Sequence, residues 1–200
     1  MKFYQYLFRE RIFAFAILGL TGCILAPVSR ASLDLSPQQE TFDLDGMKMS
    51  QLAFNTGGKT KATYQPPLAW KCSGGRDYLE LQPDGMAQVK ARVSKSPASP
   101  DISFDAEGCK RLTEKVITAL PEGSEQVKIL SEELNPLQID GKRTFLVELS
   151  YVFYGERFAC YSLFLDRVPE MIVFRLNCRE SNYQALRAEF HRSLYSWQNL

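Results

Sequence analysis

The side chains with the most evident chemistry in this sequence are its five cysteines and its one histidine. A cysteine thiol becomes a nucleophile when an adjacent base removes its proton and a third group orients that base. Cys72 or Cys109 could be paired with His191 in this way, but the sequence nominates no orienting group. A thiol-dependent enzyme is therefore the weakest functional hypothesis.

Motifs for other chemistry are absent from the sequence. There is no G-x-S-x-G, H-E-x-x-H or EF-hand pattern, and no zinc-type C-x-x-C pair. Residues 57–60, Gly-Gly-Lys-Thr, look like the end of a phosphate-binding loop, but that motif needs a glycine where Ala53 stands, so a hairpin turn is the better interpretation. Glu132 and Glu133 would point to opposite faces of a strand and cannot act as a pair. We expect no enzymatic activity, catalytic residue, cofactor or metal ion.

A basic start followed by an uncharged apolar run opens the chain. Lys2, Arg9 and Arg11 precede residues 12–28, which carry no charge. This is the form of a bacterial export signal, and it is short for a bilayer span, which needs about 20 residues. We expect residues 1–31 to be a signal peptide and the protein to work in the periplasm or as a secreted protein.

Two processing routes are open at this signal. Leu20-Thr21-Gly22-Cys23 matches the lipobox of bacterial lipoproteins, in which the cysteine is acylated and anchors the chain to a membrane. Alternatively, Ser29 and Ala31 supply the small residues that precede an ordinary signal-peptidase cut. Residues 24–28 remain apolar, whereas lipoproteins usually become polar after the cysteine, so the cut after Ala31 is slightly favoured.

Four cysteines would remain after export, and an oxidising compartment permits disulfides among them. The alternative is that they are small, buried, apolar side chains. In the last predicted hairpin Cys160 would face about Arg175, which argues against a bond between Cys160 and Cys178. The four candidate disulfide residues are Cys72, Cys109, Cys160 and Cys178.

The composition is that of a globular protein with little attraction for polyanions. Hydrophobic residues make up 45% and charged residues 24% of the chain, which excludes collagen, coiled coil and disorder for its bulk. Without residues 1–31 the chain has 20 basic and 22 acidic residues, a net charge of −2. We therefore expect no nucleic-acid partner, and a membrane contact only if Cys23 is acylated.

The residue patterns predict strands before and after a central helix. Residues 32–48 are polar and mixed, and we expect a tether or flexible arm there, followed by a single domain over residues 49–200. Residues 145–153 predict a long strand that is apolar on both faces and therefore covered on both sides. Other strands are predicted at 51–54, 60–65, 78–81, 87–93, 127–130, 158–165 and 171–176.

Two helices complete the prediction. Asp105 is expected to cap one that runs to about Leu120. Ser181 and Gln184 form a capping-box pattern at the start of the second. Its apolar face would hold Tyr183, Leu186, Phe190, Leu194 and Trp197. The predicted fold is an α+β domain, an antiparallel sheet with a mid-chain helix and a C-terminal helix.

Eight aromatic residues crowd three neighbouring predicted strands. They would either form sheet core and cross-strand pairs or present an exposed patch that docks a partner or an apolar ligand. Trp70 and Trp197 are expected in the core. The eight are Phe145, Tyr151, Phe153, Tyr154, Phe158, Tyr161, Phe164 and Phe174.

The order of motifs over residues 50–200 resembles a known superfamily. Asp140-Gly141-Lys142 precedes a strand ending in Ser150-Tyr151-Val152-Phe153-Tyr154-Gly155, an aromatic hairpin and Asn177-Cys178. Residues 182–186 and 190–197 follow, and Tyr64 to Trp70 reads Tyr-Gln-Pro-Pro-Leu-Ala-Trp, with Leu68-Ala69 where a glycine is common. The chain resembles the PsbP-like α/β/α sandwich superfamily in these features.

That superfamily includes extrinsic subunits of the photosynthetic oxygen-evolving complex, DcrB-type exported bacterial proteins and a nuclear Ran-binding protein. The resemblance implies an α/β/α sandwich and a non-enzymatic role, with no catalytic residues to transfer. We expect an exported accessory or binding protein of the bacterial cell envelope, whose partner there is a protein or an apolar ligand. The alternative is a structural envelope lipoprotein anchored through Cys23.

Overall fold

The computed structural model describes residues 32–97, 104–167 and 170–200. The predicted signal peptide, Cys23 and the small residues before the predicted cut lie outside these ranges. Within them, no helix has the length and apolar character that a bilayer span requires.

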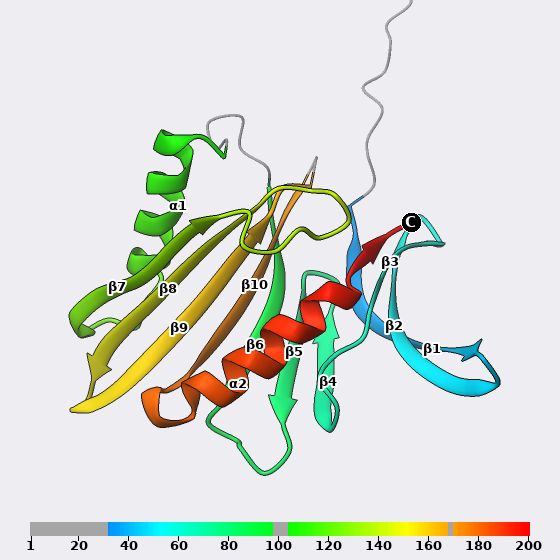
Figure 1. Ribbon diagram of the computed structural model, residues 1–200, viewed down its shortest axis with the longest axis horizontal. Coiled ribbons are helices and arrows are strands. Elements are labelled where there is room, and N and C mark those ends of the chain that lie inside the picture. Colours follow the sequence, from blue (N-terminus) through cyan, green and yellow to red (C-terminus); the bar gives the residue numbers. More distant parts are fainter. Residues whose placement is uncertain (1–31, 98–103, 168–169) are drawn as a thin grey trace, which may run out of the picture.

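A seven-stranded antiparallel sheet forms the body of the molecule, in the order β4-β5-β6-β10-β9-β8-β7 (Figure 1). Its strands are β4 (Trp70–Gly75), β5 (Tyr78–Pro83), β6 (Lys90–Pro97), β7 (Glu125–Leu134), β8 (Thr144–Phe153), β9 (Glu156–Leu165) and β10 (Glu170–Arg179). The strand predicted to be covered on both sides is β8, and most of its residues are buried. The short strand predicted at 127–130 is the centre of the longer edge strand β7.

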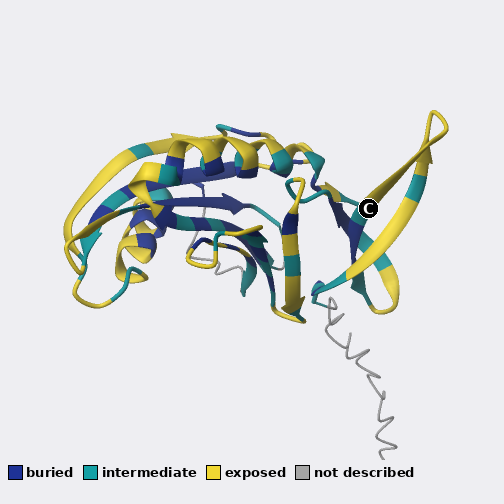
Figure 2. Ribbon diagram, turned by 90° about the horizontal axis from the view of Figure 1, so that it is seen from below, coloured by how far each residue is buried: buried dark blue, intermediate teal, exposed yellow. Residues whose placement is uncertain are grey.

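One helix covers each face of this sheet. Leu112 and Val116 of α1 (Ala106–Thr118) pack with Val147 and Leu149 of β8. On the opposite face, Leu186 and Phe190 of α2 (Glu180–Ser193) belong to a second cluster that includes β9 and β10. Figure 2 shows the buried face of α2 against the sheet. The predicted α/β/α sandwich is confirmed.

The two helix starts differ in their capping. The Asp105 carboxylate accepts a hydrogen bond from the Gly108 amide at 2.8 Å, so the predicted cap of α1 is confirmed. The predicted capping box of α2 is wrong, because the helix begins at Glu180 and its N-cap, Arg179, makes no side-chain cap bond. Strand β10 runs directly into α2, so Ser181 already lies inside the first helical turn.

A second, four-stranded sheet has the order β1-β2-β3-β11. It consists of β1 (Asp34–Leu44), β2 (Met47–Thr56), β3 (Lys59–Tyr64) and β11 (Gln198–Asn199). The prediction of a tether over residues 32–48, with the domain starting at 49, is wrong. Leu33 and Leu35 are fully buried in the core. The Asp45-Gly46 turn, with positive φ at both residues, closes β1 and β2 into a hairpin.

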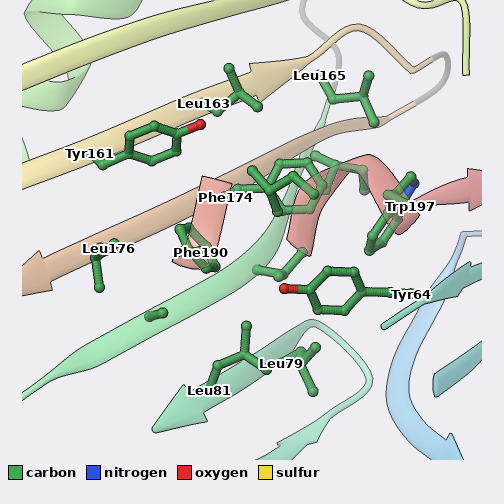
Figure 3. Packing of buried hydrophobic residues seen from close by; sticks show 14 of the residues in the cluster. Tyr64, Leu79, Leu81, Tyr161, Leu163, Leu165, Phe174, Leu176, Phe190 and Trp197 are labelled. Carbon is green, nitrogen blue, oxygen red and sulfur yellow. The ribbon is translucent and has the colours of Figure 1, made fainter. Parts of the chain in front are cut away.

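Trp197 joins the two sheets. It follows α2 through a short 3₁₀ turn (Leu194–Ser196) and is 1% exposed. Its ring stacks on Phe54 of β2 at a centroid distance of 5.4 Å and meets Phe174 of β10 edge-on at 5.1 Å. Figure 3 shows Trp197, Phe174 and Tyr64 converging at this junction. Both predicted core tryptophans are buried, since Trp70 is also 8% exposed.

Candidate docking surface

The four cysteines of the described residues are free thiols, which is the second of the two alternatives that the sequence left open. Cys160 lies opposite Asn177, and Cys178 lies opposite Ala159. The predicted register, with Cys160 facing Arg175, is wrong because the observed pairs of β9 and β10 are displaced by two positions along β10. Neighbours in a strand point to opposite faces. Cys160 therefore packs on the α1 face and Cys178 on the α2 face, which keeps them unpaired.

None of these thiols is activated as a nucleophile. Burial raises the pKa of Cys72 and of Cys178 to about 11, and it also raises the pKa of Cys109 and of Cys160. A reactive cysteine needs a lowered pKa, because the thiolate is the nucleophile. Cys109 lies beside an open groove of about 410 Å³ between α1 and β7, on the opposite face of the sheet from α2 and its His191. The Cys109–His191 pair is therefore not assembled.

His191 is part of a polar network beneath α2. Its Nδ1 lies 2.9 Å from the Tyr161 hydroxyl of β9. Burial, and then the nearby Arg187 cation, lower the pKa of His191. The ring therefore favours its neutral form, and when Nδ1 carries no proton the Tyr161 hydroxyl donates to it. The hydrogen-bond partner of the His191 ring is therefore the Tyr161 hydroxyl and not a cysteine thiol.

Glu148 is the buried acid of the same network, and the sequence analysis missed it. It lies on β8 with 7% exposure and accepts a hydrogen bond from the Tyr183 hydroxyl at 2.5 Å. Arg187 donates to both carboxylate oxygens, at 2.9 and 3.2 Å. Tyr183 and Arg187 are four residues apart on α2, so both face the sheet. The only sequence signal was a single charged residue in a strand that is otherwise uncharged and mostly apolar.

The other sequence candidates are placed as structural features. Gly57 and Gly58 have positive φ in the turn between β2 and β3, so the hairpin interpretation of residues 57–60 is confirmed. Glu132 lies opposite Val147 and Glu133 opposite Leu146, on alternate faces of the sheet. Among the residues that the structure describes, no group of three or more histidine, cysteine or acidic side chains is arranged to hold a metal ion.

The aromatic cluster is core in its larger part. Phe145, Tyr151 and Phe164 are buried on the α1 face, while Tyr161 and Phe174 are buried on the α2 face. Phe153 and Phe158 are half-buried against the α1 cluster. Tyr154 is the member left in solvent, at 90% exposure in the β8–β9 turn. The core interpretation is confirmed for the others.

An exposed apolar surface lies instead on the far half of the β1–β2 hairpin, residues 39–51, which we call the ribbon. Strand β3 pairs with β2 only from Leu52 onward, so the ribbon consists of two strands with no third strand paired to them. It projects from the body, and most of its residues are exposed (Figure 2). Phe42 lies opposite Met49, and Leu44 lies opposite Met47.

These four side chains share one face of the ribbon. Directly paired residues point to the same side, as do residues two apart in a strand. Leu44, Met47 and Met49 are 51%, 61% and 36% exposed. The opposite face carries the pairs Thr41–Ser50 and Asp43–Lys48. The ribbon is thus a narrow amphipathic element with its apolar face in solvent.

The apolar face of the ribbon is not part of the hydrophobic cluster under α2. In β2 the members of that cluster are Leu52 and Phe54, and Ala53 between them is also buried. Met47 and Met49 have the opposite parity and therefore point to the other side of the strand. Ala53 shares their parity and is buried at the root of the ribbon, whereas Leu44, Met47 and Met49 at the tip are exposed. Packing of the core therefore does not account for the apolar residues at the tip. The sequence signal was present, since Asp-Gly flanked by alternating apolar residues predicts a hairpin.

No protein-family model matches the sequence, and no curated protein matches it. The structure is similar to a protein of unknown function from Pseudomonas aeruginosa, PA94, with a TM-score of 0.48, 14% identity and coverage of 80% of this chain and 95% of that one. It is also similar to cyanobacterial PsbP (CyanoP) from Synechocystis, with a TM-score of 0.47, 14% identity and coverage of 88% and 96%. At this identity and TM-score the likeness concerns the fold alone.

Proposed function

We propose that this protein is an exported, non-enzymatic binding or accessory protein of the bacterial cell envelope, and that it docks a partner protein through the apolar face of the ribbon. The observation that carries the proposal is the apolar face of the projecting two-stranded hairpin, on which Leu44, Met47 and Met49 are exposed to solvent and Phe42 beside them is half-buried. Export is proposed from the signal-like residues 1–31. Contiguous exposed apolar surface marks interaction sites in soluble proteins.

The charges on the ribbon favour a protein over a lipid surface. The ribbon contains three acidic residues and one basic residue, so its net charge over residues 39–51 is −2. The acids are Glu40, Asp43 and Asp45, and the base is Lys48. Anionic lipid attracts basic segments and repels acidic ones. Methionine side chains adapt to the shape of the surface that they contact. The complementary partner surface is therefore an apolar patch with a basic rim.

Site-specific photo-crosslinking in the host envelope tests this proposal. A photoreactive amino acid at Leu44 or Met47 should crosslink to one protein, whereas the same group at Asp43 or Lys48, on the opposite face, should not. The double variant Phe42→Ser/Met49→Ser should weaken the crosslinked complex by at least about tenfold, because buried apolar anchors dominate interface energy. Thr41→Ala/Ser50→Ala is the matched control and should bind normally.

Other crosslinking products would contradict the proposed partner. Crosslinks to lipid would make the ribbon a membrane contact, and crosslinks between two copies of the chain would make it a self-association surface. The second candidate, an envelope lipoprotein, is favoured by the Leu20-Thr21-Gly22-Cys23 sequence. It is distinguished by acylation that is lost in Cys23→Ala.

A further inference from the structure

Ser32 and Leu33, which precede β1, are held against the edge of the large sheet by a cluster of charged side chains. The Ser32 hydroxyl donates to one carboxylate oxygen of Glu170, and the Leu33 amide donates to the other at 3.0 Å. Lys95 donates to the Ser32 hydroxyl at 2.8 Å and to the Leu33 carbonyl at 2.7 Å. Side chains from β6 and β10 thus both hydrogen-bond to the backbone of Leu33.

The two central charged side chains of this cluster are largely buried. The side chains of Lys95 and Glu170 are 7% and 15% exposed. Asp77, in the turn between β4 and β5, lies 3.0 Å from Lys95, and Arg167, before β10, lies 3.8 Å from Glu170. Each carboxylate oxygen can accept more than one hydrogen bond, so Glu170 has capacity for a further donor.

This cluster lies directly after the predicted cleavage site of the signal peptide. Ser32 directly follows Ala31, the predicted signal-peptidase cut. A cut there would turn the Ser32 nitrogen into an α-ammonium group. That nitrogen is three bonds from the Ser32 hydroxyl and three from the Leu33 nitrogen, and both of these groups already contact Glu170.

We propose that Ser32 is the N-terminal residue of the working protein and that its α-ammonium group pairs with Glu170, so that the export cut completes the cluster that fastens β1 to β6 and β10. The proposal rests on the export included in the proposed function. The processing step is hydrolysis by a membrane signal peptidase, in which water cleaves the Ala31–Ser32 amide. Ala31 leaves with the carboxylate, and Ser32 retains the new ammonium.

The pairing has a defined pH dependence. A free α-amino group titrates near pH 8 in an unfolded chain. An ammonium held by Glu170 has a raised pKa in the folded state, opposed in part by the nearby Lys95 and Arg167 cations and supported by Asp77. Its contribution to stability is therefore fully present below about pH 8 and is lost as the pH rises through the folded-state pKa.

Two proteins made in vitro test the pairing independently of export. One begins at Ser32, released from a cleavable fusion, and the other carries Gly-Gly before Ser32. The Ser32 form should melt about 2 to 4 °C higher at pH 7. The difference should disappear in Glu170→Gln and should shrink above pH 9. Glu156→Gln, which alters an exposed acid paired with Arg179, is the matched control and should preserve the difference.

Two further measurements decide the assignment. The Ser32 α-amine of the intact protein should titrate above pH 8, and a value at or below 8 would overturn the pairing even if Glu170→Gln fails to fold. Equal melting temperatures of the Ser32 form and the Gly-Gly form would also overturn the pairing. The protein recovered from its host envelope should have the mass of a chain that starts at Ser32. A start at acylated Cys23 would refute the assignment of the N-terminus while leaving the ribbon experiment unaffected.

Discussion

His191 and Glu148 belong to one network of polar contacts that fixes α2 to the sheet. Tyr161, the partner of His191, lies directly opposite Glu148 in the β8–β9 pair. Burial raises the pKa of the Tyr161 hydroxyl, which keeps its proton available for donation to the imidazole. Each member satisfies another, and buried polar groups that are left without partners cost free energy. At the scale of single residues this network is a support for the helix.

The lowered pKa of His191 predicts a loss of stability on acidification. In the unfolded chain histidine titrates near pH 6.5. Because burial and Arg187 lower the folded pKa, the unfolded state binds the proton first as the pH falls, and stability decreases below about pH 6.5. Glu148 and Glu133 oppose this shift in part. Urea unfolding between pH 7.5 and 5.5 should show a steeper decline for the native protein than for His191→Gln.

This comparison isolates one group, because His191 is the only histidine in the sequence. Glutamine can still accept a hydrogen bond from Tyr161 and does not titrate. Equal slopes in the two proteins would show that the histidine titrates alike in the folded and unfolded states.

At the scale of elements, the two helices begin by different means. Helix α1 follows a loop and uses the Asp105 side chain as its cap. Helix α2 continues from β10 and has its first turn held by the network at Glu148 instead. A local sequence pattern therefore has an energetic effect at one helix and none at the other.

Matched alanine substitutions should separate the two cases. Asp105→Ala should lower the free energy of unfolding by about 1 kcal/mol, the usual value for an N-cap. Ser181→Ala should change it by less than about 0.5 kcal/mol, because Ser181 lies within α2 and makes no cap bond. Chemical denaturation followed by circular dichroism measures both. A larger loss for Ser181→Ala would mean that its hydroxyl caps the helix in solution.

At the scale of the whole molecule, the chain end binds the two sheets together. Trp197 fills the junction, Tyr64 of β3 meets Ser193 at 2.7 Å, and β11 pairs with β3. The small sheet thereby shares a core with the large one, and it supports the root of the ribbon. An isolated two-stranded hairpin is only marginally stable in water, so this support is what allows the ribbon to project.

Trp197→Ala should therefore weaken the molecule as a unit. We expect a loss of about 3 to 5 kcal/mol, the usual cost of removing a buried large aromatic side chain. Hydrogen exchange should accelerate in β2 and β3 as well as in β10. Tyr195→Ala, two residues earlier and 64% exposed, should cost less than about 1 kcal/mol. Unchanged exchange in β2 and β3 would show that the small sheet is held by other contacts.

The elements whose signals are local could be predicted from the sequence. The spacing of Leu112 and Val116, the cap at Asp105 and the glycines at 57 and 58 act within a few residues, and the structure agrees with them. The apolar face of α2 was predictable for the same reason. The alternation around Asp45-Gly46 was equally local, although the polar composition of residues 32–48 masked it.

Contacts between residues far apart in the sequence depend on the tertiary fold and were not predictable. Ser32 and Glu170 are 138 positions apart, and Glu148 and Tyr183 are 35 apart. A shift of one residue in a turn changes every pair in a hairpin, so the separation of Cys160 from Cys178 could be fixed only by the observed register. Buried charges are stable only beside their partners. The tertiary fold, which assembles those partners, therefore placed both the cluster at Ser32 and the exposed face of the ribbon.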